Sequence, residues 1–158
     1  MRLGITGHRG LSLQVEAQVR AQLAALVDDL DGGDLTVISC IADGPDSWLA
    51  QLVLQHGGRL EAVIPATEYR DGLPEWHHSV YDELMARAAD VHHTGLREST
   101  SQAHQAGSEI VVGLADQLVA VWDGKPARGY GGTADVVAYA QRVGVPVRII
   151  WPKGAARD

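Results

Sequence analysis

Short apolar runs alternate with segments of helical periodicity along the whole chain. The run Arg2–Thr6 (RLGIT) is followed by apolar residues at helical spacing from Val15 to Leu30, with Ser12 as the expected N-cap. Continuous apolar strands joined by helices predict an α/β fold of three layers (α/β/α), with a mostly parallel sheet and right-handed connections. Further strands are predicted at 35–40, 60–64, 90–94, 117–122 and 147–151, and further helices between 46 and 57 and at 81–89, 102–114 and 133–143.

The size and charge of the chain limit what it can bind. Its 158 residues fit one domain spanning 1–158, large enough to bury a core without disulfides. The formal net charge of −7 argues against broad contact with nucleic acid phosphates, so we expect nucleic acid to be an unlikely partner. A small anionic ligand is compatible with this charge, because a few backbone N–H groups and one arginine suffice for a phosphate.

Cysteine and histidine usage gives no indication of a metal site. The single Cys40 cannot form an internal disulfide, and the pairs His77-His78 and His92-His93 place adjacent side chains in different directions. We therefore predict no metal site and no resident cofactor. No apolar run approaches about 18 residues, and there is no signal-peptide pattern, so the predicted location is cytoplasmic, without a membrane partner.

The unusual residues follow four of the predicted strands. In an open parallel sheet, ligands bind outside the carboxyl ends of the strands. The loops at those ends read GHRG (7–10), ADGPD (42–46), PATEYR (65–70) and DGKPARGYGGT (123–133). Their placement at one edge of the sheet predicts the ligand site there.

The loop before the last predicted helix is the most informative. Gly131 and Gly132 precede a helix that begins at Thr133, where free N–H groups attract anions and the Thr133 hydroxyl can bind a phosphate or cap the helix. Arg128 in the same loop can pair with that phosphate. The alternative interpretation is a tight turn that needs the glycines, with Arg128 in solvent.

Two other loops offer further contacts. Gly7, His8 and Arg9 can form a second phosphate cradle, although the spacing differs from the G-x-G-x-x-G dinucleotide motif. The alternative is a turn whose arginine is solvated. Asp43 and Asp46, on either side of Gly44, can accept hydrogen bonds from ribose hydroxyls or can cap the helix that follows.

Four stretches resemble the SLOG superfamily, which includes DprA/Smf proteins and LOG ("lysine decarboxylase-like") proteins. They are GITGHRGL (4–11), SCIADGPDSWLAQLVL (39–54), VIPATEYRDG (63–72) and ADQLVAVWDGKPARGYGGTADVVAYAQRVGVPV (115–147). The resemblance implies a Rossmann-like fold with a site for nucleotides or nucleotide-derived ligands on these loops. Relatives of this fold often form dimers, so it also implies a homodimer.

The chain departs from the LOG motif P-G-G-x-G-T-x-x-E, with which LOG enzymes cleave a nucleoside monophosphate to free base and ribose 5-phosphate. Val136 stands at the position of the motif glutamate, and Gly107 lies near the position of the matching arginine. The remaining candidates for a catalytic acid are Asp135, one residue early and about 100° away around a helix, and Glu109.

Three hypotheses about function stay open. The first is a binding or sensing domain, without turnover, for a phosphorylated nucleotide-derived small molecule such as a nucleoside phosphate or an ADP-ribose-like compound. The second is a nucleoside 5′-monophosphate phosphoribohydrolase of LOG type that uses Asp135 or Glu109. The third is a scaffold for a protein partner, in which the glycine loops are only structural.

Overall fold

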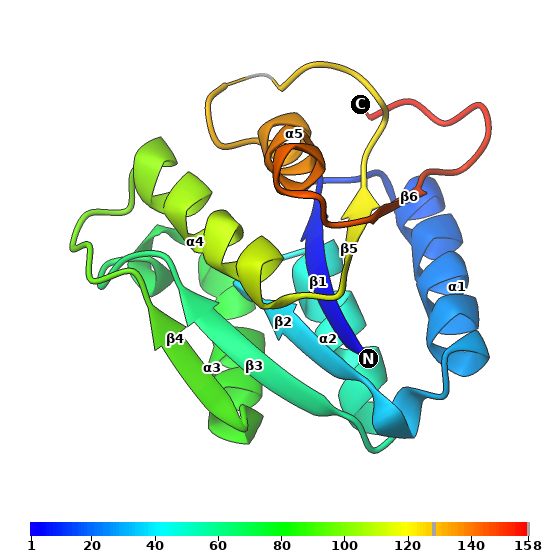
Figure 1. Cartoon of the computed structure of the whole chain (residues 1–158), viewed down its shortest axis with the longest axis horizontal. Coiled ribbons are helices and arrows are strands. Elements are labelled where there is room, and N and C mark those ends of the chain that lie inside the picture. The colour runs from blue at the N-terminus through cyan, green and yellow to red at the C-terminus, as the bar shows by residue number, and fades with distance from the viewer. Residues whose placement is uncertain (128, 158) are drawn as a thin grey trace.

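The computed structural model describes residues 1–127 and 129–157, which form one parallel sheet between two layers of helices (Figure 1). Every pair of neighbouring strands is parallel, as predicted. The strands are β1 (Arg2–Gly7), β2 (Thr36–Ser39), β3 (Arg59–Ile64), β4 (Asp90–His93), β5 (Gln117–Val121) and β6 (Val147–Ile150), in the order β4-β3-β2-β1-β5-β6.

The helices in the described residues divide between the two faces of this sheet. The helices are α1 (Leu13–Asp29), α2 (Pro45–Gln55), α3 (His78–Arg87), α4 (Ser101–Leu114) and α5 (Thr133–Val143), with short 3-10 helices at Gly32–Asp34, Arg70–Gly72 and Glu75–His77. Helices α1, α2 and α3 pack side by side on one face, and α4 and α5 pack on the other (Figure 1). This arrangement confirms the predicted three-layer α/β/α fold. Among the described residues, no helix is both long enough and apolar enough to span a bilayer.

Local signals explain how the elements begin and what they bury. The Ser12 hydroxyl accepts a hydrogen bond from the N–H of Val15 at 3.3 Å and caps α1, as predicted. The inner side of α1 then buries Val19 and Leu23 completely. Because the chain has no phenylalanine, aliphatic side chains such as Leu3, Ile38 and Leu118 fill the core on both faces of the sheet.

The segment between β3 and α4 differs in detail from the prediction. The periodicity predicted a helix at 81–89, whereas α3 begins at His78, directly after a 3-10 turn and without a capping side chain. The predicted strand at 90–94 is confirmed as β4. Helix α4 begins one residue before the predicted start, where the Thr100 hydroxyl accepts from the N–H of Ala103.

The direction in which the chain winds reverses beside β1. Strand β1 pairs with β2 on one side and with β5 on the other, so the loops that follow β1 and β5 diverge to opposite faces of the sheet. Such a reversal leaves a crevice at the carboxyl edge of a parallel sheet. The glycine-rich loops of the sequence lie at this crevice.

Candidate functional site

A pocket of about 330 Å³ opens at the reversal point, between the strand ends and the α4–α5 layer. Its walls come from the ends of β1, β2 and β3, from α4 and from the loop before α5. The predicted residues that line it are Gly7, His8, Arg9, Asp46, Gly131, Gly132 and Thr133. Arg128 lies outside the described residues.

Asp43 and Gly44 line a neighbouring pocket of about 270 Å³ instead. That second pocket lies on the α1–α2 side of the loop at 42–46, between Arg20, Trp48 and Trp76. We take the first pocket as the candidate site, because it contains the glycine loop and the start of α5.

The glycine loop presents a helix start to the pocket. Gly132 is the N-cap residue of α5 and no side chain of residues 1–127 or 129–157 caps the helix, so its first turn has backbone donors available to a ligand. Gly131 has φ +84°, and a Cβ there would lie 2.7 Å from the carbonyl oxygen of Ser101, so glycine is required for packing on α4. Thr133 is the first residue of α5 and is buried at the pocket wall.

The two weak catalytic candidates do not line this pocket. The carboxylate of Asp135 accepts a hydrogen bond from the N–H of Gly131 at 2.9 Å, so Asp135 stabilises the conformation of the glycine loop. Glu109 lies on α4 and accepts a hydrogen bond from the side chain of Gln105 at 3.3 Å.

Arg9 brings a fixed positive charge to the pocket wall. Its Nε donates to Oδ1 of Asp43 at 2.9 Å, and its Nη2 lies 2.6 Å from the same oxygen. Burial alone would lower the pKa of Arg9, but the bond to Asp43 and its charge outweigh this and raise it. The guanidinium therefore stays charged, with donors left for a ligand.

Asp46 supplies the acidic group of the pocket. It is the second residue of α2, after Gly44 as N-cap and Pro45, so it does not cap this helix. Burial of its carboxyl group raises its pKa to about 7, although the N–H of Ala42 and the charge of Arg9 both favour the ionised form. Near neutral pH, Asp46 can either donate or accept a hydrogen bond at the pocket wall.

His8 joins the end of β1 to the end of β5. The backbone N–H of Asp123 donates a hydrogen bond to Nε2 of His8 at 3.2 Å. The imidazole ring of His8 packs edge-on against Trp151, with 5.6 Å between the ring centroids. Gly7 is fixed by packing, since a Cβ there would lie 2.9 Å from ring carbons of Pro45 and 3.0 Å from Cβ of Val121. Both residues thus shape the pocket as well as lining it.

Several lining residues were missed by the sequence analysis. Cys40 and Tyr69 are buried at the wall, and burial raises the pKa of the thiol and of the phenol, so both stay neutral. His104 and Ser108 face the pocket from α4, and their i, i+4 spacing was an available signal that one helix face is polar. Arg157 adds a second cation from the C-terminal segment, where no periodic pattern indicated structure.

Comparisons with known proteins establish the fold. No protein-family model matches the chain, and no curated protein matches it. DNA processing protein A (DprA) from Helicobacter pylori superposes on 100% of this chain and 68% of its own, with a TM-score of 0.75 and 17% identity. DprA from Streptococcus pneumoniae covers 97% of this chain with a TM-score of 0.68 and 20% identity. The chain spans about half, 51%, of that protein.

A third structure has the same fold. The molybdenum cofactor binding protein of Rippkaea orientalis superposes on 94% of this chain and 74% of its own, with a TM-score of 0.59 and 18% identity. The chain therefore has a Rossmann-like α/β fold with a pocket at the reversal point. This is the fold found in the DprA structures, and it confirms the fold that the resemblance to the SLOG superfamily implied.

One prediction from the net charge was wrong. Nucleic acid was expected to be an unlikely partner, yet the fold is shared with DprA proteins, and the H. pylori structure is described for its single-stranded DNA binding mode. Net charge averages over the whole surface, whereas a strand of DNA contacts one local face. Here Arg9 and Arg157 both line one pocket of an acidic chain.

Proposed function

We propose that the protein binds a phosphorylated, nucleotide-derived molecule in the pocket at the carboxyl edge of the sheet. The phosphate lies at the start of α5, against Gly131, Gly132 and Thr133, and Arg9 provides the counter-charge. The observation that supports this most directly is the convergence of an uncapped helix start and two arginines in one pocket of about 330 Å³.

The sugar and base of such a ligand extend along the rest of the pocket wall. Asp46 accepts from a ribose hydroxyl when ionised and donates to an oxygen when protonated. Tyr69 and His104 pack edge-on with their ring centroids 5.6 Å apart and give the wall an aromatic part. Aromatic side chains at a pocket wall can pack against a planar ring such as a nucleobase.

The ligand can be a free nucleotide or a nucleotide within single-stranded DNA, because both present the same phosphate. The likeness to the DprA structures is the reason to test single-stranded DNA as well as free nucleotides. The two differ in salt dependence, since binding to a strand through several phosphates loses affinity with a slope of roughly −0.7 per phosphate in log K against log salt. A single nucleotide contacts the protein through one terminal phosphate group or a short chain of them.

A hydrolase is a second candidate, and Asp46 is the observation that favours it. Cleavage of an N-glycosidic bond needs an acid to assist departure of the base, and a group with a pKa near the working pH is well suited to that role. Asp46 lines the pocket and has a pKa of about 7, whereas Asp135 and Glu109 lie outside it. Release of free base from AMP by the wild type, lost in Asp46→Asn, would establish this activity.

Thermal-shift and calorimetric titrations test the binding proposal. The ligands are AMP, ADP, ADP-ribose, NAD, cyclic nucleotides and a short single-stranded oligothymidylate. A ligand at about 100 times its Kd should stabilise the protein by roughly 2.7 kcal/mol. We expect binding to be lost in Arg9→Ala and in Thr133→Val.

Arg59→Ala is the matched control, because Arg59 is an exposed arginine at the opposite end of the sheet, where β3 begins. It should bind like the wild type. No binding of any of these ligands would refute the proposal and favour a scaffold role. Binding of the oligonucleotide alone would identify DNA as the source of the phosphate.

A further inference from the structure

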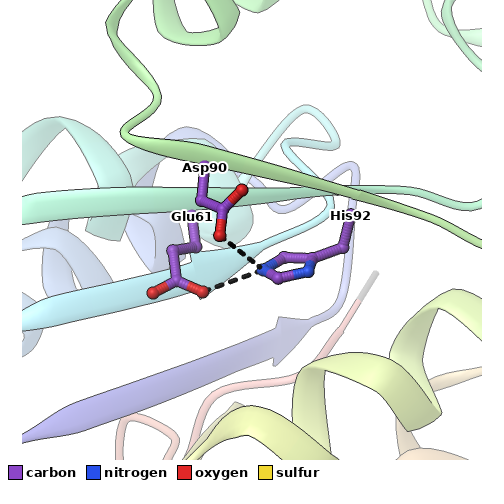
Figure 2. A group of neighbouring side chains, drawn as sticks. All are labelled: Glu61, Asp90 and His92. Atoms are coloured by element: carbon purple, nitrogen blue, oxygen red, sulfur yellow. Dashed lines mark hydrogen bonds and ion pairs between the residues drawn. The ribbon is translucent and has the colours of Figure 1, made fainter.

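Three side chains on the neighbouring strands β3 and β4 converge on one point, away from the pocket (Figure 2). Glu61 and Asp90 are register partners on parallel strands, and His92 follows Asp90 by two residues, so all three point to the same face of the sheet. Arg2, which reaches this cluster, also donates to the carbonyl oxygen of Leu114, so the face is the one on which α4 packs.

One ring nitrogen of His92 faces two carboxylates at distances that bracket those between ligands of one metal ion. Oε1 of Glu61 lies 2.9 Å from Nε2 of His92, and Oδ2 of Asp90 lies 3.8 Å from the same nitrogen. One imidazole N–H cannot donate well to two carboxylates at once. Metal–ligand distances of about 2.0–2.2 Å around Zn²⁺ place neighbouring ligand atoms roughly 3–3.5 Å apart. The observed separations lie on either side of this range.

The surrounding contacts hold both carboxylates in place. Arg2 donates to the two oxygens of Glu61 at 2.7 and 3.0 Å, and its bond to Glu61 is the main reason why the pKa of that carboxyl is about 2. Oδ1 of Asp90 accepts from the N–H of Val91 at 2.9 Å, which turns Oδ2 toward His92. Such outer contacts orient the ligands in known metal sites.

The local charge also favours a dication. Glu61, Asp90 and Asp116 bring three negative charges, and Arg2 brings one positive charge; Asp116 joins the group by accepting from the backbone N–H of Arg2 at 2.9 Å. With neutral His92 the cluster therefore has a formal charge of −2, which one divalent ion would neutralise.

We propose that Glu61, Asp90 and His92 bind one divalent transition-metal ion, with Zn²⁺ as the best match. The imidazole disfavours Mg²⁺ and Ca²⁺, which prefer oxygen ligands throughout. The side chain of Asp90 is exposed, so water can reach an ion held there. A metal site was not predicted because the adjacent His92 and His93 point in different directions, whereas this site takes one histidine and two carboxylates from adjacent strands.

The test is a calorimetric titration of the untagged full chain with ZnCl₂ near pH 7.5. We expect one Zn²⁺ per chain, weakened at least about 10- to 100-fold in His92→Ala and in Asp90→Asn. His93→Ala is the matched control, since this exposed neighbour should be irrelevant. Co²⁺ should give a visible d–d absorption band in the wild type and in His93→Ala only.

Folding of each variant is checked by circular dichroism. Asp90→Asn keeps the shape of a largely exposed side chain and so tests the site without a large effect on the fold. Two results would overturn the proposal and leave the cluster as an ion-pair network between strands. One is that the wild type does not bind Zn²⁺, and the other is that His92→Ala and Asp90→Asn bind it as tightly as the wild type.

Discussion

Two nitrogens of the Arg9 guanidinium contact the same carboxylate oxygen of Asp43: Nε lies 2.9 Å and Nη2 lies 2.6 Å from Oδ1. Asp43 is buried, whereas the side chain of Arg9 is half exposed at the pocket. The pair joins the loop after β1 to the loop before α2. Arg9 is therefore both a candidate ligand contact and the partner of a buried charge.

Removal of Arg9 should destabilise the fold as well as the site. In Arg9→Ala the Asp43 carboxylate loses its ion-pair partner, and we expect a loss of about 1–2 kcal/mol in the free energy of unfolding. The double variant Arg9→Ala/Asp43→Asn should recover most of this loss, since it also removes the buried negative charge of Asp43. Urea denaturation of the four proteins of this double-mutant cycle measures the effect. Additive losses would mean that the two side chains do not interact.

Asp135 should position the glycine loop and should have no catalytic role. Asp135→Ala removes the acceptor for the N–H of Gly131, so we expect weaker nucleotide binding and a stability loss of about 0.5–1.5 kcal/mol. Asp135→Asn keeps an acceptor oxygen and should bind nearly as well as the wild type. Calorimetric Kd values for the two variants decide the matter. A variant that binds normally but releases no base would instead assign Asp135 a catalytic role.

The succession of strands and helices could be read from the sequence because apolar periodicity reports burial directly. Strand β5 is apolar and buried on both faces from Leu118 to Val121. The buried face of α1 is marked by aliphatic residues that recur at helical spacing. The start of α3 was missed for the same reason. It begins at His78, after an exposed Trp76 and a buried His77, where no periodic pattern exists.

The candidate site was predictable only where a strand leads into it. Gly7 ends β1, Arg9 follows it and residues 131–133 belong to the loop after β5, and the topology brings strand ends together. Tyr69 lies in the loop after β3, one of the loops named from the sequence, but its place in the pocket wall follows from packing. His104 reaches the pocket from α4 and Arg157 from the C-terminal segment, neither of which is a loop at a strand end. The pairing of Arg9 with Asp43 likewise depends on two loops that are 34 residues apart.

Two glycines should respond to alanine in opposite directions. Gly7→Ala places a Cβ within 3.0 Å of Pro45 and Val121, so we expect a destabilisation of about 1–3 kcal/mol. Gly113 lies in α4 with nothing within 4 Å of such a Cβ, so Gly113→Ala should stabilise the protein, by up to about 1 kcal/mol. Chemical denaturation of both variants measures the difference. A neutral Gly7→Ala would show that the contact between β1 and α2 can relax.

Asp46 should make the stability depend on pH in a predictable direction. The folded-state pKa of about 7 lies above the ordinary value of 3.8, so between these two values the folded protein holds a proton that the unfolded chain has released. The free energy of unfolding therefore falls as the pH rises from about 4 to 7, by at most about 1.4 kcal/mol per unit from this group, and is constant above that range. Below pH 4 both states are protonated and Asp46 contributes no slope.

Asp46→Asn isolates this contribution, because contributions from distant titrating groups cancel when the variant is compared with the wild type. We expect Asp46→Asn to gain stability relative to the wild type as the pH rises from 5 to 8. Urea denaturation at each pH gives the difference. Nucleotide binding should weaken above pH 7 in the wild type alone, since ionised Asp46 then repels the phosphate. Parallel curves for the two proteins would mean that Asp46 is already ionised in the folded protein at pH 5.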